Sequence, residues 1–500
     1  MNDVTEHTIA STQGGIMILG LGPGDPELLT RQAWNWIRQA DEIYLRTKRH
    51  PTVAGFPAGL AVYSFDDLYE QSQKFEEVYA SIVDRVLELG RRPQGVTYAV
   101  PGSPMVAEAT SPEILRRARE EGIPVRVVEG MSFLEPTFSA IGLDPFLGTA
   151  LVDALDLVNA HVTNFPPSLP ALICQIYSRE VAAQVKLTLM EVYPDEHPVK
   201  LVHAAGTAGQ QVEELALYQI DRSEATGLLT TLYLPPLGPD TSFEAFQEVI
   251  AHLRAPNGCP WDREQTHTSL RQHLLEETYE ALAALDQLDY PAMVEEFGDL
   301  LLQIVLHAQI ATEEGNFRMA DILQGIHRKI VRRHPHVFGD FQVAGVSGVL
   351  ANWEKLKAAE RVANGKDGQK VKGLLDGVPL ALPALTQAQE IQDRAARVGF
   401  DWKEIDGVLE KVKEEIDEIG GAPDAEALAG EIGDLFFAVV NVARWKKVDA
   451  ESALRETNER FRKRFAFIEK AAREQGRRLD EMSFEEMDSL WEAAKKERGE

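Results

Sequence analysis

Residues 414–418 read EEIDE, and residues 431–434 read EIGD. The second motif starts thirteen residues after the first one ends (431 − 418 = 13). The first motif continues an apolar stripe that begins at Val408 and follows helical spacing. The second motif lies in a segment that is apolar at almost every position. The polar side chains of this segment would share one seam of a helix: Glu431, Asp434 and Asn441. The sequence therefore predicts an all-α region in which two helices meet through carboxylates.

Four carboxylates of these motifs border apolar surface and repel one another: Glu415, Glu418, Glu431 and Asp434. Like charges one helical turn apart cost about 0.2–0.5 kcal/mol per pair when solvated, and far more when half buried. A divalent cation relieves both costs, and a hard cation with oxygen ligands, Mg²⁺ or Mn²⁺, fits best. The alternative is a solvated acidic helix face, which is the commoner meaning of EExxE taken alone. That alternative fits the second helix poorly, because this helix has no solvated side to spare.

The same charged signature occurs a second time, earlier in the chain. Residues 276–280 read EETYE and residues 296–299 read EFGD, which gives each proposed metal ligand a counterpart: Glu277, Glu280, Glu296 and Asp299. Each copy is followed by a basic pair and then by a tryptophan and a lysine: Lys329, Arg333, Trp353 and Lys357 in the first, and Arg460, Arg464, Trp491 and Lys495 in the second. The pattern indicates an internal repeat of about 130 residues.

The tandem motifs, with GCPWDREQTH at 258–267 and RRHPHVFGD at 332–340, resemble the MazG family of nucleoside triphosphate pyrophosphohydrolases. The resemblance covers residues 240–500, divided into repeat 1 (240–360) and repeat 2 (373–500) by a polar connector. It implies an all-α, magnesium-dependent enzyme that hydrolyses the link between the α- and β-phosphates of nucleoside triphosphates. It also implies a homodimer.

Pyrophosphohydrolysis needs neutralised phosphate charge, an activated water and a held nucleoside. Glu414 is a candidate for activating the water or orienting a ligand. Three cations are candidates for neutralising the triphosphate: Arg460, Arg464 and Lys495. Asn441 offers a donor and an acceptor to the substrate, and Trp402 and Trp491 offer stacking surfaces, although core packing explains both tryptophans equally well. Repeat 1 has Leu306 where repeat 2 has Asn441 (299 + 7 and 434 + 7), so we expect repeat 2 to carry most of the activity.

The N-terminal part begins with a strand, a glycine-rich loop and a helix. Residues 16–19 (IMIL) predict a short buried strand, residues 20–30 (GLGPGDPELLT) a loop, and residues 31–40 a helix. Glycine permits close backbone approach and positive φ, so the arrangement is typical of phosphate or nucleotide cradles. The spacing matches neither GxGxxG nor a P-loop. Taken alone, such a loop most often means a tight turn.

Further strands are predicted at 43–45, 97–100 and 125–128, and the last two end in PGSP (101–104) and EGMSF (129–133). Alternating strands and helices give a parallel α/β sheet, whose ligand crevice lies at the carboxyl ends of the strands. These loops resemble the tetrapyrrole (corrin/porphyrin) methylase family, and the likeness extends over residues 16–235. It implies a two-lobed α/β fold that binds S-adenosylmethionine between the lobes. The residues implied for cofactor binding are Gly20, Gly22, Gly24, Asp25, Pro101, Gly102 and Ser103.

Three functions stay open. The first is a nucleoside triphosphate pyrophosphatase that releases a nucleoside monophosphate and pyrophosphate. The second is an S-adenosylmethionine-dependent methyltransferase with an accessory helical half, and the third is a ligand-sensing module that regulates the other half. Ser103 stands where the methylase family usually has an aspartate, which weighs against the second function.

Composition excludes several classes of protein. The 500 residues are 44% hydrophobic, enough for two or three domains. A net charge of −28 argues against a stable nucleic-acid partner. Cys174 and Cys259 are far apart and predict no disulfide framework. The polar N-terminus has no signal-peptide pattern, and no apolar run reaches the roughly eighteen residues that span a bilayer. We therefore expect a cytoplasmic protein with no membrane partner.

Overall fold

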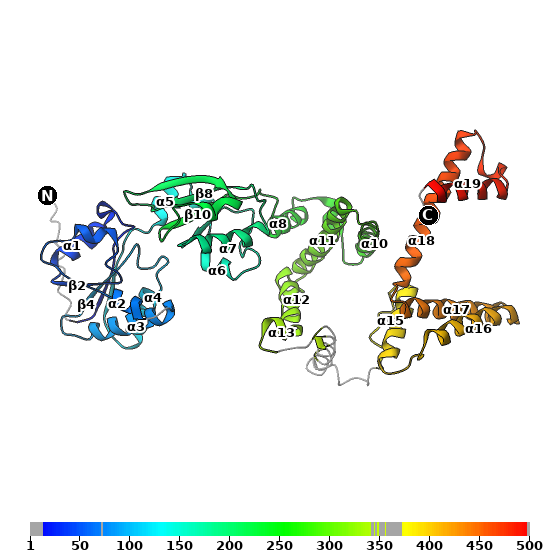
Figure 1. The fold of residues 1–500 in the computed structure, drawn as a ribbon, viewed down its shortest axis with the longest axis horizontal. Helices are drawn as coiled ribbons and strands as arrows, with labels where there is room; N and C mark the ends of the chain where they lie inside the picture. The colour runs from blue at the N-terminus through cyan, green and yellow to red at the C-terminus, as the bar shows by residue number, and fades with distance from the viewer. Residues whose placement is uncertain are drawn as a thin grey trace. The chain divides into compact units, whose positions relative to one another are not determined.

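The structure is a computed structural model of the chain (Figure 1). It describes residues 14–71, 74–341 and 373–497, with positions 345, 348, 349 and 356. The chain forms two compact units, Met1–Ala255 and Pro256–Glu500. Within the described residues, no helix combines the length and the apolar character needed to cross a membrane. Trp353, Lys357 and the connector at 361–372, which the sequence singled out, lie outside the described residues.

The first sheet is parallel, with strand order β3-β2-β4-β1-β5. The strands are β1 (Ile16–Gly20), β2 (Glu42–Leu45), β3 (Ala61–Ser64), β4 (Val96–Val100) and β5 (Val125–Val128). In β1, Ile16 and Ile18 enter one buried cluster, and Met17 and Leu19 enter another, because successive side chains of a strand face opposite sides. The first cluster is completed by α3 (Phe75–Gly90) and α4 (Thr110–Glu120), and the second by α1 (Arg31–Gln39).

The four strands predicted for this lobe are confirmed, and each agrees with its expected bounds to within one residue. Strand β3 was missed because none of its residues is fully buried: they alternate between exposed and half-buried positions. The parallel register pairs Gly20 with Val100, and Leu19 with Val128. This register brings the three glycine-containing loops to one edge of the sheet.

The second sheet is mixed, with strand order β6-β7-β10-β8-β9. Only β6 and β7 pair in parallel, and the other three pairs are antiparallel. The strands are β6 (Ala150–Asp153), β7 (Ala171–Cys174), β8 (Pro198–His203), β9 (Gln211–Ala216) and β10 (Thr230–Leu234). The core between this sheet and helix α7 (Arg179–Met190) contains Val185, Leu201 and Leu232. This lobe confirms the second lobe of the two-lobed α/β fold that the resemblance implies. The first unit also contains α2 (Asp66–Gln71), α5 (Leu134–Ile141), α6 (Ala154–Val158) and α8 (Phe243–Arg254).

The second unit is helical throughout its described residues. Its helices are α9 (Pro260–Glu264), α10 (Arg271–Gln287), α11 (Tyr290–Glu313), α12 (Met319–Arg333), α13 (Pro335–Phe338), α15 (Ala384–Arg397), α16 (Ile405–Gly421), α17 (Ala425–Trp445), α18 (Ala450–Glu474) and α19 (Phe484–Glu497). Asp289 and Asp424 cap α11 and α17, because the side chain of each accepts a hydrogen bond from a backbone N–H of the first turn. The pairs α10–α11 and α16–α17 pack side by side and are equivalent elements of the two repeats (Figure 1).

Helix α17 is less buried than its apolar sequence predicts. Val440 is buried, but Phe436 is 60% exposed and Val439 49% exposed. The expectation that this helix has no solvated side is therefore wrong for the single chain. The reason is that α15 and α16 pack against only part of its circumference.

Candidate metal and nucleotide site

The carboxylates of repeat 2 come together between α16 and α17. Glu415 and Glu418 project from α16, and Glu431 projects from α17. One oxygen of each can be chosen so that all three lie within 4.8 Å of one another. The spacing of three residues places Glu415 and Glu418 on one face of α16. The packing of α17 against α16 brings Glu431 to the same face.

Burial differs sharply among these three carboxylates. Glu415 is 3% exposed, and its Oε2 is buried without a hydrogen-bond partner. Glu418 is exposed and Glu431 is half-buried. Loss of solvation, followed by the charges of Glu431 and Glu415, raises the pKa of Glu418. The cluster therefore concentrates negative charge beside a buried oxygen that has no donor.

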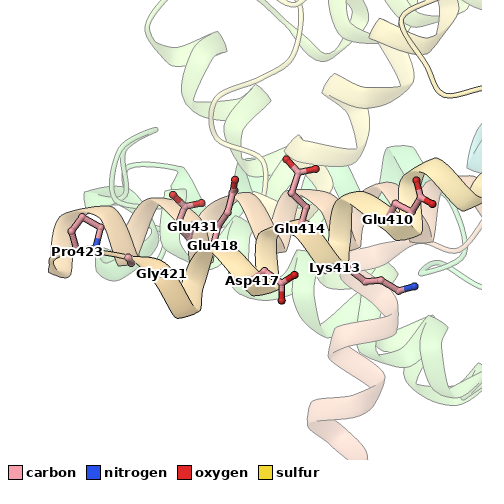
Figure 2. A pocket seen from close by; sticks show the side chains of 9 residues that line it. Glu410, Lys413, Glu414, Asp417, Glu418, Gly421, Pro423 and Glu431 are labelled. Atoms are coloured by element: carbon pink, nitrogen blue, oxygen red, sulfur yellow. The ribbon is translucent and has the colours of Figure 1, made fainter.

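A pocket of about 750 Å³ opens beside this cluster. Its lining residues are Glu410, Lys413, Glu414, Asp417, Glu418, Gly421, Ala422, Pro423 and Glu431. In Figure 2 the carboxylates of Glu414, Glu418 and Glu431 point to the same side of the helices, whereas the ammonium group of Lys413 points away from them. Five of the nine lining residues are acidic, so the pocket attracts cations.

Lys411 contacts two of the acidic residues, and this contact was not predicted from the sequence. Its Nζ lies 2.7 Å from Oε1 of Glu415 and 2.8 Å from Oε1 of Glu414. The sequence spacing could have indicated this contact, because Lys411 precedes Glu415 by four residues, the spacing at which helical side chains meet. Glu414, which we expected to activate a water, is thus bound to Lys411 in this structure.

Repeat 1 assembles the same cluster independently. Glu277 and Glu280 of α10 and Glu296 of α11 offer oxygens within 4.8 Å of one another. Loss of solvation, followed by the charges of Asp299, Glu280 and Glu296, raises the pKa of Glu277. Loss of solvation and neighbouring carboxylates also raise the pKa of Glu296. The duplicated motif therefore produces duplicated geometry.

Other predicted residues of repeat 2 lie on α17 or just before α16, outside the three-carboxylate cluster. Asp434 is exposed and does not belong to the three-carboxylate group. Asn441 is buried, and its Oδ1 accepts a hydrogen bond of 2.9 Å from Nε of Arg444. Arg444 also binds Asp401, and Trp402 packs against Gly407 at the start of α16.

The predicted cations and Trp491 form a separate group on α18 and α19. The guanidinium of Arg464 lies over the ring of Trp491 at 5.2 Å from its centroid, and Phe461 packs against the same ring. Arg460 pairs with Glu456, and Lys495 pairs with Glu492. Among the described residues that line the carboxylate pocket, none comes from α18 or α19.

The first unit has a second candidate site where the glycine loops converge. Gly22 and Gly102 form an isolated antiparallel bridge, with N···O distances of 3.2 and 2.8 Å. A Cβ at Gly20 would lie 2.6 Å from the backbone nitrogen of Gly130, so only glycine fits there. Gly24 and Gly102 have φ of +145° and +68°. A Cβ at Gly102 would enter open space, as expected beside a crevice.

The remaining predicted residues of this crevice hold the loops in place. The carboxylate of Asp25 accepts a hydrogen bond from the backbone N–H of Glu27, and its own backbone N–H donates to the carbonyl of Gly206 in the second lobe. Ser103 is buried, and Pro101, two residues earlier, is half-buried. Two buried residues of this lobe were not predicted from the sequence: Glu108, which pairs with Arg46, and His50. Burial lowers the pKa of His50 to about 4.

Comparisons with known proteins agree with both halves. Residues 265–338 match the model of the MazG nucleotide pyrophosphohydrolase domain. The Nucleoside triphosphate pyrophosphohydrolase/pyrophosphatase MazG of Thermotoga maritima is 44% identical over 253 residues, which cover 51% of this chain and 95% of that protein. This chain belongs to the MazG family. The Nucleoside triphosphate pyrophosphohydrolase of Escherichia coli K12 matches at 43% identity over 50% of this chain and 95% of its own length.

This MazG chain carries an additional N-terminal part. Residues 15–221 match the model of Tetrapyrrole (Corrin/Porphyrin) Methylases. Uncharacterized protein YabN of Bacillus subtilis is 44% identical over 491 residues, which cover 96% of this chain and 98% of that protein. The MazG match at 265–338 contains the repeat 1 cluster. The combination of a methylase-like α/β part with a MazG part therefore extends over the full length of a relative.

Proposed function

We propose that the helical unit hydrolyses nucleoside triphosphates to nucleoside monophosphates and pyrophosphate, using Mg²⁺ or Mn²⁺. The observation that carries this proposal is the three-carboxylate cluster, which is built twice from the same motif. In repeat 2 it includes a buried oxygen of Glu415 that has no donor. The relatives of this chain from Thermotoga maritima and Escherichia coli K12 are named as nucleoside triphosphate pyrophosphohydrolases.

The residues present fit a hard divalent cation. Oxygen is the only donor type in the cluster, and Mg²⁺ and Mn²⁺ prefer carboxylate oxygens and retained waters. Glu415, Glu418 and Glu431 would hold the ion in repeat 2, with Asp434 at the edge of the group. Glu277, Glu280, Glu296 and Asp299 would hold it in repeat 1. When bound, such an ion neutralises phosphate charge and lowers the pKa of a coordinated water.

The chain's other residues bind and orient the substrate in this proposal. Glu414 positions the attacking water once it is released from Lys411. The cations Arg460, Arg464 and Lys495 neutralise the triphosphate, and the nucleoside is held by Asn441, Trp402 and Trp491. In the single chain these groups lie on different helices from the carboxylates, apart from Asn441 on α17 and Trp402 just before α16. A homodimer accounts for this separation, since the exposed apolar side chains of α17, such as Phe436, require a cover.

The N-terminal α/β part (16–235) is proposed to bind S-adenosylmethionine or a related adenosine compound in the crevice of the glycine loops. The close contact of Gly22 with Gly102 and the open space above Gly102 support this. Methyl transfer and ligand sensing both stay compatible with this crevice. The helical repeats at 240–360 and 373–500 are then the catalytic part. Both cysteines are free thiols, which fits our assignment to the reducing cytoplasm.

The test is product identification with a panel of canonical and damaged ribo- and deoxyribonucleoside triphosphates. Purified protein with Mg²⁺ should release monophosphate and pyrophosphate in equal amounts, and excess chelator should stop the reaction. Release of diphosphate and orthophosphate, or undiminished turnover in chelator, would overturn the proposal.

A further inference from the structure

The cluster of repeat 2 already contains a cation. Lys411 contacts Oε1 of Glu415 at 2.7 Å and also contacts Glu414. The side chain of Glu415 is 4% exposed, whereas that of Lys411 is 37% exposed. An exposed lysine therefore reaches inward to a buried carboxylate. The other oxygen of that carboxylate, Oε2, is buried without a hydrogen-bond partner, so the carboxylate still has one position that no donor fills.

Repeat 1 differs at the corresponding position. Four residues before Glu277 stands His273, where repeat 2 has Lys411 four residues before Glu415. Nδ1 of His273 lies 3.4 Å from Oε2 of Glu276. In the described part of the chain, no lysine or arginine pairs with Glu277, Glu280 or Glu296. The two clusters thus share their carboxylates and differ in whether a fixed positive charge accompanies them.

We propose that Lys411 is an internal cation that competes with divalent metal for Glu415, so that repeat 1 takes up metal at lower concentration than repeat 2. A metal ion that approaches Glu415 meets the ammonium charge a few ångströms away and must displace it. Repeat 1 presents the same carboxylates without that repulsion. Repeat 2 therefore becomes loaded only when free metal is abundant. Lys411 acts through Glu415 and is a positioning residue.

This inference rests on the proposed function, because it assumes that the clusters hold metal. The experiment is calorimetric titration of Mn²⁺ into the full-length protein, without nucleotide. A Glu277→Gln, Glu280→Gln background removes two carboxylates of the repeat 1 cluster, so that the remaining heat of Mn²⁺ binding reports on repeat 2. In this background Lys411→Met and Lys411→Arg are compared. Lys413→Met is the matched control, because Lys413 lies two residues away on the same helix and points away from the carboxylates (Figure 2).

The wild-type chain should show two classes of site, and the background should keep only the weaker class. Lys411→Met should then bind Mn²⁺ roughly tenfold more tightly, as expected for removing one charge near partly solvated carboxylates. Lys411→Arg should change the affinity little. Lys413→Met should change it by less than about threefold, because exposed charges farther away are screened.

Unchanged or weaker Mn²⁺ binding in Lys411→Met would overturn the inference while leaving the metal site intact. Equal affinity for the two repeats in the wild-type chain would also overturn it. Absence of Mn²⁺ binding in every variant would instead contradict the proposed function. If Lys411→Met does not fold, Lys411→Gln replaces it, since glutamine keeps a donor for Glu415 without the charge.

Discussion

Replacing Glu415 by glutamine probes the buried end of the repeat 2 cluster. The substitution keeps the shape of the side chain and removes the charge, so the pocket should lose a metal ligand without a cavity. We expect pyrophosphate release at repeat 2 to fall ~100- to 1000-fold, the range found when one preorganised electrostatic group is removed. Glu277→Gln makes the same change in repeat 1. It should cost much less if repeat 2 carries most of the activity.

Folding should barely change in the metal-free Glu415→Gln variant. The lost pair with Lys411 destabilises the helix, while relief of repulsion by Glu418 and Glu431 stabilises it. The metal-bound state is affected differently. A single site at a hundredfold excess of metal over its Kd stabilises a protein by about 2.7 kcal/mol, which raises Tm by roughly 5–10 °C for a unit of this size. The variant should lose this increase at repeat 2.

The assay is pyrophosphate release at saturating nucleotide, with thermal melts in Mg²⁺ and in chelator. A Glu415→Gln enzyme with wild-type turnover, beside an inactive Glu277→Gln enzyme, would show that repeat 1 carries the activity instead. Equal losses would indicate that both repeats turn over. A collapse of the metal-free Tm would refute the reasoning about opposed charge effects.

Three further predictions concern pH, the glycine crevice and assembly. Because the folded state raises the pKa of Glu418 above its ordinary value of 4.5, the folded chain holds a proton that unfolding releases. Metal-free stability should therefore fall as pH rises above that ordinary value, and Glu418→Gln should show a smaller fall in Tm. Gly20→Ala places a Cβ 2.6 Å from a backbone nitrogen and should lower the free energy of unfolding by about 2 kcal/mol or more. It should also abolish any calorimetric heat with S-adenosylmethionine. A variant that is stable and still binds would contradict the packing described for Gly20. Phe436→Asp should shift a dimer to monomer in sedimentation experiments, whereas an unchanged mass would place the dimer contact elsewhere.

The meeting of Glu415, Glu418 and Glu431 could be expected from the sequence because local geometry determines it, whereas Asp434 lies outside the group of three. Once α16 and α17 are helices, the spacing of Glu415 and Glu418 places both on one face, and repetition of the motif in repeat 1 supported that reading. The parallel strands β1, β4 and β5 were also predictable, since each is a short segment rich in apolar and β-branched residues that ends before a glycine-containing loop.

The parts that the sequence did not predict depend on tertiary packing. Strands β6 and β9 lack a clear buried pattern, so their periodicity was weak. The exposure of Phe436 depends on which helices cover α17, and an apolar sequence does not specify its neighbours. For the same reason, Arg464 and Trp491 could be chosen from their chemistry, but their contact with each other could not be foreseen. The spacing of Lys411 and Glu415 allowed their contact, but its importance depends on the burial of Glu415, which the sequence does not specify.

The most direct test is a double variant, Glu277→Gln with Glu415→Gln, which disables both clusters in the full-length chain. Pyrophosphate release and Mn²⁺ binding are measured on the same preparation, and circular dichroism confirms the helical content. We predict that both turnover and metal binding are lost while the fold is retained. A folded double variant that still releases pyrophosphate in a metal-dependent way would show that the catalytic metal is bound elsewhere.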